Sequence, residues 1–268
     1  MRILFFGDIV GRPGRNGVAS MLPVWQQEFS PDIIIANGEN AAGGMGITPD
    51  IATEIFADGV DVITLGNHVW QKRDIVSMLD EDPRIIRPAN YPPGVPGRGW
   101  GVFKVSQEKG THPPLAIVNL VGRVFMEDYD DPFRGVDVIL DEIDTPLILV
   151  DFHAEATSEK MAFGFHVDGR VSAVIGTHTH VQTADERILA EGTAYITDVG
   201  MCGPLDSVIG MNKEIILKKF LTLMPARFEV ASGDPIVSAV VIELDDRSGK
   251  AVSITRLNKR MVKSLKDY

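Results

Sequence analysis

Short apolar runs rich in isoleucine and valine alternate along the chain with longer segments of helical pattern. The runs lack the polar alternation of a half-exposed strand, so we interpret them as strands buried on both faces. They lie at residues Arg2–Phe6, Asp32–Ala36, Val60–Leu65, Leu115–Leu120, Pro146–Phe152, Val171–Ile175, Ala194–Thr197 and Ile236–Leu244. Helical patterns fit Arg15–Phe29, Thr48–Asp58, Lys72–Leu79 and Asn212–Leu223. Strands and helices in alternation predict an α/β fold.

Length and composition exclude several classes of protein. The chain has 268 residues, of which 44 % are hydrophobic and 24 % charged, as in a globular protein with a sizeable core. We expect a single domain over residues 1–268, because no shift in composition marks a boundary. No apolar run reaches the length of about 18 residues that a membrane span needs. A single cysteine, Cys202, and an apolar start interrupted by Asp8 favour a cytoplasmic protein.

The charge balance limits what the chain can bind. It has 26 basic and 37 acidic residues, which gives a formal net charge of −11. Such a charge opposes binding to the backbone of an extended nucleic acid, so we expect no partner of that kind. A small phosphate compound can bind where something local cancels the acidic charge, and metal ions are the usual means.

Polar side chains follow five of the apolar runs, at the point where each predicted strand ends. Ligands of open α/β sheets bind beyond the carboxyl ends of the strands, so these side chains are expected at one edge. The segments are Gly7-Asp8, Asn37-Gly38-Glu39-Asn40, Gly66-Asn67-His68, Asp151-Phe152-His153 and Gly176-Thr177-His178-Thr179-His180. The candidate metal ligands in them are Asp8, Glu39, Asn40, Asn67, His153, His178 and His180.

Each motif alone has a simpler explanation. Asp8 can be a helix cap, Glu39 with Asn40 can form a solvated turn, and His153 can be a hydrogen-bonded core histidine. The occurrence of all five motifs at strand ends favours a shared metal site over these separate explanations.

The types of ligand indicate the metal. Carboxylate, imidazole and amide groups without cysteine argue for a hydrolytic site with iron, manganese or zinc rather than structural zinc. Seven candidates exceed what one ion with an open position can use, so we expect two divalent or trivalent ions. Two divalent ions outweigh the negative charges of Asp8 and Glu39, which leaves a positive site suited to phosphate.

The order of these motifs resembles that of the calcineurin-like metallophosphoesterases, most closely the YmdB-type bacterial phosphodiesterase branch. A further segment, Asn119-Leu120-Val121-Gly122-Arg123 with Phe125-Met126, is similar to that branch. Two departures from the wider superfamily agree with it: Val10 replaces the histidine of the first Asp-x-His motif, and Glu39 replaces an aspartate.

The resemblance implies a fold, an activity and a set of roles. The fold is a two-sheet sandwich flanked by helices, in four layers αββα. The activity is hydrolysis of small cyclic nucleotides, 2′,3′-cyclic ones first and 3′,5′-cyclic ones as a further class, by a metal-bridging hydroxide that attacks phosphorus. We expect iron first, with manganese or zinc as alternatives. Glu39 bridges the two ions, and the remaining ligands divide into Asp8, Asn40 and His180 for one ion and Asn67, His153 and His178 for the other.

Four further residues are candidates beside the metal ligands. His68 is expected to protonate the leaving ribose oxygen, with a hydrogen bond that orients a carboxylate as the alternative. Arg15, Arg123 and Phe125 are candidate substrate contacts, against purely structural roles in a turn and a loop. Two other functions stay open: a phosphomonoesterase or protein phosphatase, and a nucleotide-sensing regulatory protein. We also expect a homo-oligomer without a membrane partner.

Overall fold

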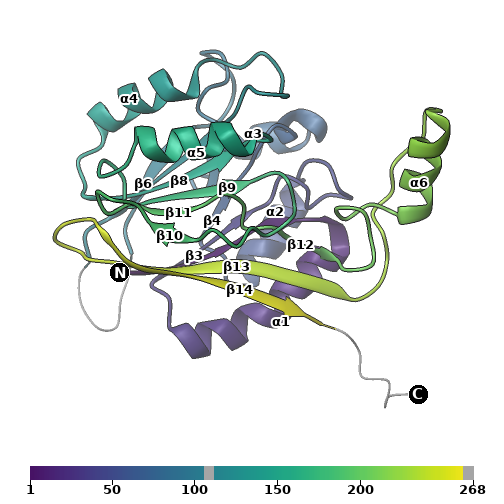
Figure 1. Ribbon diagram of the computed structural model, residues 1–268, viewed down its shortest axis with the longest axis horizontal. Helices are drawn as coiled ribbons and strands as arrows, with labels where there is room; N and C mark the ends of the chain where they lie inside the picture. Colours follow the sequence, from purple (N-terminus) through teal and green to yellow (C-terminus); the bar gives the residue numbers. More distant parts are fainter. Residues whose placement is uncertain (106–111, 262–268) are drawn as a thin grey trace.

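The computed structural model describes residues 1–105 and 112–261, which form two sheets packed face to face with helices on both outer sides (Figure 1). One sheet has eight strands. Its order is β2 (Asp8–Ile9), β12 (Met201–Pro204), β13 (Pro235–Leu244), β1 (Arg2–Phe6), β3 (Ile33–Asn37), β4 (Val62–Thr64) and β5 (Ile85–Ile86), and β14 (Ala251–Arg260) also pairs with β13. Strands β1, β3, β4 and β5 run parallel, so their carboxyl ends lie at one edge.

The second sheet has six strands and a parallel centre. Its order is β10 (Arg187–Ile188), β11 (Ala194–Ile196), β9 (Ala173–Thr177), β8 (Leu147–His153), β7 (Leu115–Val121) and β6 (Trp100–Phe103). Strands β7, β8, β9 and β11 run parallel to one another. This sheet therefore also presents several carboxyl ends at one edge.

Alternate residues of the strands build the layers. In β1, Ile3 and Phe5 join a buried cluster that contains Ile117 and Ile175 of the other sheet, so this cluster lies between the sheets. The intervening residues of β1 pack outward, in a cluster shared with α1 (Gly11–Phe29), α2 (Pro49–Ala57) and α3 (Ile75–Glu81). The outer face of the six-stranded sheet packs on α4 (Pro132–Glu142) and α5 (Thr157–His166). The predicted four-layer αββα sandwich is thus confirmed.

The predicted strands all form, with ends within two residues of those expected. Thr48 caps α2 as predicted, because its hydroxyl accepts a hydrogen bond from the Ile51 amide at 3.4 Å. Helix α1 begins four residues before the predicted Arg15, at Gly11, and Pro13 is tolerated because it lies in the first turn. Within the described part of the chain, no helix is long and apolar enough to cross a membrane.

Helices α4 and α5 and the long strand β14 were not predicted from the sequence. Asp131 caps α4 through the amides of Phe133 and Arg134, and Pro132 follows it, so a helix-start signal was present there. Strand β14 lies at the margin of its sheet and is only partly buried, so it lacks the continuous apolar run by which the other strands were found.

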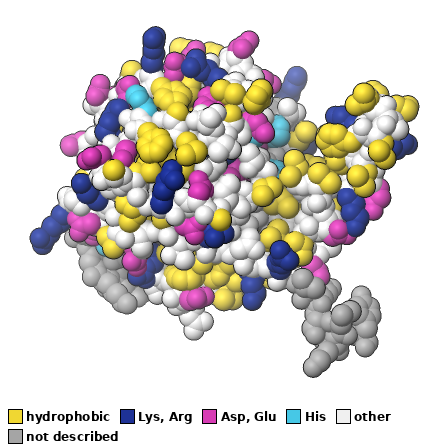
Figure 2. All heavy atoms as spheres, viewed as in Figure 1, with side chains coloured by type: hydrophobic (Ala, Val, Ile, Leu, Met, Phe, Trp, Pro, Cys, Tyr) yellow, Lys and Arg dark blue, Asp and Glu magenta, His cyan; other side chains and the backbone are white. Residues whose placement is uncertain are grey.

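Helix α6 (Lys213–Thr222) stands away from the two sheets (Figure 1). Apolar side chains are exposed on it and just after it, and Figure 2 shows them gathered on this projection. The exposed residues are Leu217, Phe220, Leu221, Leu223 and Met224.

Substitution of Gly176 tests the close packing at the end of β9. A Cβ there would lie 1.7 Å from the Thr197 carbonyl oxygen, so Gly176→Ala must displace backbone. We expect it to lower the free energy of unfolding by about 3 kcal/mol or more. Gly135→Ala is the matched control, because no atom lies within 4 Å of the added Cβ.

In α4 the control should raise the free energy of unfolding by about 0.5–1 kcal/mol, since alanine favours a helix over glycine. Urea unfolding of both variants checks this. Equal stability of the two variants would contradict the packing described here.

Candidate metal centre

The ends of strands from both sheets meet at one edge of the sandwich. Asp8 lies on β2, and a turn after β3 carries Glu39 and Asn40. The segment after β4 carries Asn67 and His68. Strand β8 ends in His153, and His178 and His180 follow β9. The hydrogen bonds and close contacts below join all eight residues, so the structure brings together the seven candidate ligands and His68.

The buried carboxylate of Glu39 lies at the centre of this group. Its Oε1 is 3.2 Å from His153 Nε2 and accepts a hydrogen bond from Asn40 Nδ2 at 2.9 Å. Its Oε2 accepts one from the His68 amide at 3.1 Å. A Cβ on Gly66 would lie 2.2 Å from Glu39 Oε2, so only glycine lets the segment after β4 approach the Glu39 carboxylate so closely.

The ligand atoms of one predicted set converge, and the residues of the other set lie in contact. Asn67 Oδ1 and His178 Nδ1 lie 3.1 and 3.0 Å from His153 Nε2. Ligand atoms of Glu39, His153 and His178 all lie within 4.8 Å of one another. In the other set, His180 Nε2 lies 3.1 Å from Asn40 Nδ2 and 4.0 Å from Asp8 Oδ1. The geometry suits a metal site, and the individual ligand roles stay predictions.

Asp8 provides an independent sign of a cation site. The residue is fully buried, and its Oδ2 accepts a hydrogen bond from the His178 amide at 3.2 Å. Its Oδ1 has no hydrogen-bond partner among the described residues. Buried polar atoms are nearly always paired, so a carboxylate oxygen left in this state fits a position next to a metal ion. Burial raises the pKa of Asp8 to about 6, although His180 and His153 oppose this rise.

The carboxylates of the cluster favour a positive charge on His153. Burial opposes protonation of His153, yet Glu39 and Asp8 outweigh it and raise the pKa of His153 to about 9. Burial also acts against ionisation of Glu39, but His153 and His68 hold the pKa of Glu39 well below its usual value. Burial and the nearby His153 lower the pKa of His178 to about 3. A metal ion would take the place of the proton on His153.

A buried network holds His153 in position. Asp151 accepts hydrogen bonds from Thr64 Oγ1 at 2.5 Å, from Thr177 Oγ1 at 2.7 Å and from Asn37 Nδ2 at 3.1 Å. Thr177 Oγ1 lies 2.9 Å from His153 Nδ1, which leaves Nε2 directed at Glu39. Such partners fix the orientation of a ligating imidazole.

A buried ion pair holds the loop that carries His178 and His180. Lys160 Nζ donates to Asp198 Oδ2 and to the Thr177 carbonyl, both at 2.7 Å. The same Asp198 oxygen accepts the Thr179 amide at 3.0 Å. His178 and His180 have φ angles of +100° and +67°. Positive φ angles are strained for non-glycine residues, so surrounding contacts must hold this loop in place.

Sequence reasoning missed Lys160 and Asp198. Asp198 follows the predicted strand Ala194–Thr197 just as the other candidates follow theirs, so the same rule could have found it. Lys160 carries no such signal, because only the packing of α5 on its sheet buries it.

The other candidates lie in separate surroundings. His68 Nδ1 lies 2.9 Å from Asn40 Oδ1 and 3.4 Å from Glu39 Oε1, at the metal centre. Arg15 donates to the Ala41 carbonyl at 2.7 Å and pairs with Glu54. Arg123 pairs with Asp131 at 3.2 Å, and the Phe125 side chain is exposed. Roles of these four residues in catalysis or substrate binding stay predictions.

Comparisons with known proteins agree with this geometry. A family model described as YmdB-like protein matches residues 4–257. A Bacillus subtilis (strain 168) protein named 2′,3′-cyclic-nucleotide 2′-phosphodiesterase is 51 % identical over 259 residues, which is 96 % of each chain.

Two crystal structures have the same fold. One, of a hypothetical protein from Thermus thermophilus, has a TM-score of 0.90 at 42 % identity and covers 97 % of this chain and 100 % of that one. The other, described as a novel phosphatase from Mycoplasma pneumoniae, has a TM-score of 0.92 at 34 % identity and covers 98 % of this chain and 95 % of that one. The match along nearly the whole chain shows that this protein belongs to the YmdB-like family.

Proposed function

We propose that the chain is a metal-dependent phosphoric diester hydrolase that opens small 2′,3′-cyclic nucleotides, with 3′,5′-cyclic nucleotides as a further substrate class. One observation carries the metal chemistry: the buried Glu39 contacts His153 of one predicted ligand set and Asn40 of the other, and an oxygen of Asp8 nearby has no hydrogen-bond partner among the described residues. The substrate class follows from the relative in Bacillus subtilis, which is named for this activity.

The residues fit two metal ions. Glu39 would contact both, Asp8, Asn40 and His180 would hold one, and Asn67, His153 and His178 would hold the other. We propose iron first, with manganese or zinc as alternatives. When bound, such ions activate water for attack on phosphorus and neutralise charge on the phosphate oxygens.

His68 is positioned to supply the proton that ring opening requires. Water adds to phosphorus, the bond from phosphorus to the 2′ oxygen breaks, and that oxygen must take up a proton. The Nδ1 atom of His68 faces Asn40 and Glu39, which orients the ring, and its other nitrogen makes no hydrogen bond with the residues that the structure describes. The side chain is 24 % exposed, so a substrate can reach it. We assign His68 as the general acid.

Glu39→Gln tests the bridging carboxylate. The variant keeps the shape of the side chain and removes its charge, so it should bind fewer ions than the wild type, which we expect to hold two per chain. Turnover of adenosine 2′,3′-cyclic phosphate should fall by about 10³-fold. Elemental analysis and steady-state kinetics on the same samples measure both. Glu142→Gln, on the exposed end of α4, is the matched control and should behave as wild type.

Near-normal turnover of Glu39→Gln with two ions bound would refute the bridge. A wild-type protein that prefers phosphomonoesters or phosphoproteins would point to the phosphatase alternative. Tight binding of nucleotide without turnover would point to a sensor.

His68→Ala separates proton donation from metal binding. A ribose alkoxide is a poor leaving group that needs a proton, whereas a nitrophenolate leaves without one. The variant should therefore lose about 10²–10⁴-fold on the 2′,3′-cyclic nucleotide and much less on bis(4-nitrophenyl) phosphate, at unchanged metal content. His178→Ala should instead lose metal and slow both substrates alike. Equal losses on both substrates for His68→Ala would make His68 an orienting group.

We further propose that the chain forms a homo-oligomer in the cytoplasm. Helix α6 supports association between copies, because its exposed leucines and Phe220 form an apolar surface unusual for a monomer. Leu221→Asp should lower the mass measured by light scattering. Val138→Asp, also at an exposed apolar position but on α4, should leave the mass unchanged. A wild-type protein that is monomeric at micromolar concentration would contradict this proposal.

A further inference from the structure

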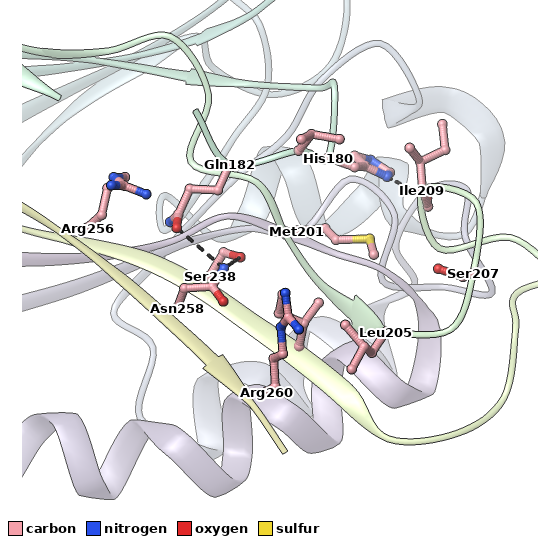
Figure 3. Close-up of a pocket in the computed structure, with 12 residues that line it drawn as sticks. His180, Gln182, Met201, Leu205, Ser207, Ile209, Ser238, Arg256, Asn258 and Arg260 are labelled. Atoms are coloured by element: carbon pink, nitrogen blue, oxygen red, sulfur yellow. Dashed lines mark hydrogen bonds between the residues drawn. The ribbon is translucent and has the colours of Figure 1, made fainter. Parts of the chain in front are cut away.

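A cavity of about 530 Å³ opens beside the metal centre (Figure 3). Its lining comes from residues 180–182, from Met201 and the segment around Ser207, and from one face of β13 and β14. His180 also belongs to the metal centre, because its Nε2 lies 3.1 Å from Asn40. The cavity and the candidate metal centre therefore adjoin at this shared residue, and the size of the cavity is typical of ligand sites.

The alternation of β14 gives one wall of the cavity its polar side chains. Arg256, Asn258 and Arg260 are two residues apart, so all three project from the same face of the strand. They lie across from Val240, Ser238 and Ile236 of β13. Lys259 lies between two of them and projects from the opposite face.

Most of these polar groups are already paired. Arg256 Nε donates to Glu186 Oε2 at 2.7 Å. Asn258 Nδ2 donates to Ser238 Oγ at 3.2 Å and to Gln182 Oε1 at 3.4 Å. Gln182 Nε2 in turn donates to backbone carbonyls, among them that of Val199 at 3.0 Å.

Arg260 differs from its neighbours. Its side chain makes no hydrogen bond or ion pair with any residue in the described ranges, and Figure 3 shows it projecting from β14 beside Asn258. The cavity is lined by no carboxylate among the described residues. An arginine side chain without a partner, in a cavity without acidic groups, is suited to an anion, and its planar fork matches the oxygens of a phosphate.

The rest of the cavity suits the organic part of a nucleotide. Met201, Leu205, Ile209 and Ile236 provide apolar surface in its lining. The cavity thus combines a metal-centre residue, apolar walls, and an unpaired guanidinium.

We propose that Arg260 binds a second phosphate of the substrate, one esterified to the 5′ oxygen of the nucleoside whose 2′,3′-cyclic phosphate lies at the metals. This inference rests on the proposed function and refines its substrate class. The second phosphate can be a free 5′-phosphate or the phosphodiester that links the terminal nucleoside of a short oligoribonucleotide. In both cases the cyclic phosphate is opened as before, and the 5′ group contributes binding only.

Three substrates test the proposal. They are adenosine 2′,3′-cyclic phosphate, the same compound with a 5′-phosphate, and a dinucleotide that ends in a 2′,3′-cyclic phosphate. The wild type should show a kcat/KM at least about tenfold higher for one or both phosphate-extended substrates, as expected for a charge-assisted hydrogen bond. The substrate that gains more identifies the source of the second phosphate.

In Arg260→Gln, kcat/KM for the phosphate-extended substrate divided by kcat/KM for adenosine 2′,3′-cyclic phosphate should be close to one. Lys259→Gln removes the same charge from the same strand but on the opposite face, and should keep the wild-type ratio. A wild-type ratio near one, or a preference that survives in Arg260→Gln, would overturn the proposal.

A binding measurement keeps this proposal separate from the proposed activity. Calorimetry should show that adenosine 3′,5′-bisphosphate binds at least about tenfold more tightly than adenosine 3′-monophosphate to the wild type, and equally to Arg260→Gln. Tighter bisphosphate binding without turnover of any cyclic nucleotide would refute the proposed activity and keep the second phosphate site. Turnover of cyclic nucleotides together with equal binding of the two compounds would support the proposed activity and refute the second phosphate site.

Discussion

The contact between the buried Glu39 carboxylate and His153 joins the two sheets of the sandwich at the candidate metal centre. Glu39 follows a strand of the eight-stranded sheet and His153 ends a strand of the six-stranded sheet, and their side chains meet at 3.2 Å. A buried carboxylate is costly without positive charge close to it. The close approach at Gly66 and the network around Asp151 serve to hold these two groups together.

The proposed function requires an acidic protein to bind phosphate. The formal net charge of −11 repels anions at long range, so attraction must come from local positive charge. Glu39 and Asp8 raise the pKa of His153, so these carboxylates favour positive charge beside them. Arg260 would add a second local positive charge in the adjoining cavity. A substrate with two phosphates would thus meet both.

The parts of the structure predictable from sequence are those set by local pattern. Continuous apolar runs identified the buried strands, and the polar residues after them identified the strand-end cluster. Lys160 and the cavity beside His180 were not predictable, because both depend on packing between segments far apart in the chain. Strand β14 was not predicted for a related reason, since a partly buried edge strand carries polar residues that interrupt its apolar pattern.

Anomalous X-ray scattering from crystals of the metal-loaded protein would locate the ions relative to Glu39. We expect two peaks, both in contact with the Glu39 carboxylate, one next to Asp8 and His180 and the other next to His153 and His178. A single peak, or peaks away from Glu39, would contradict the assignment of this cluster as a two-metal centre.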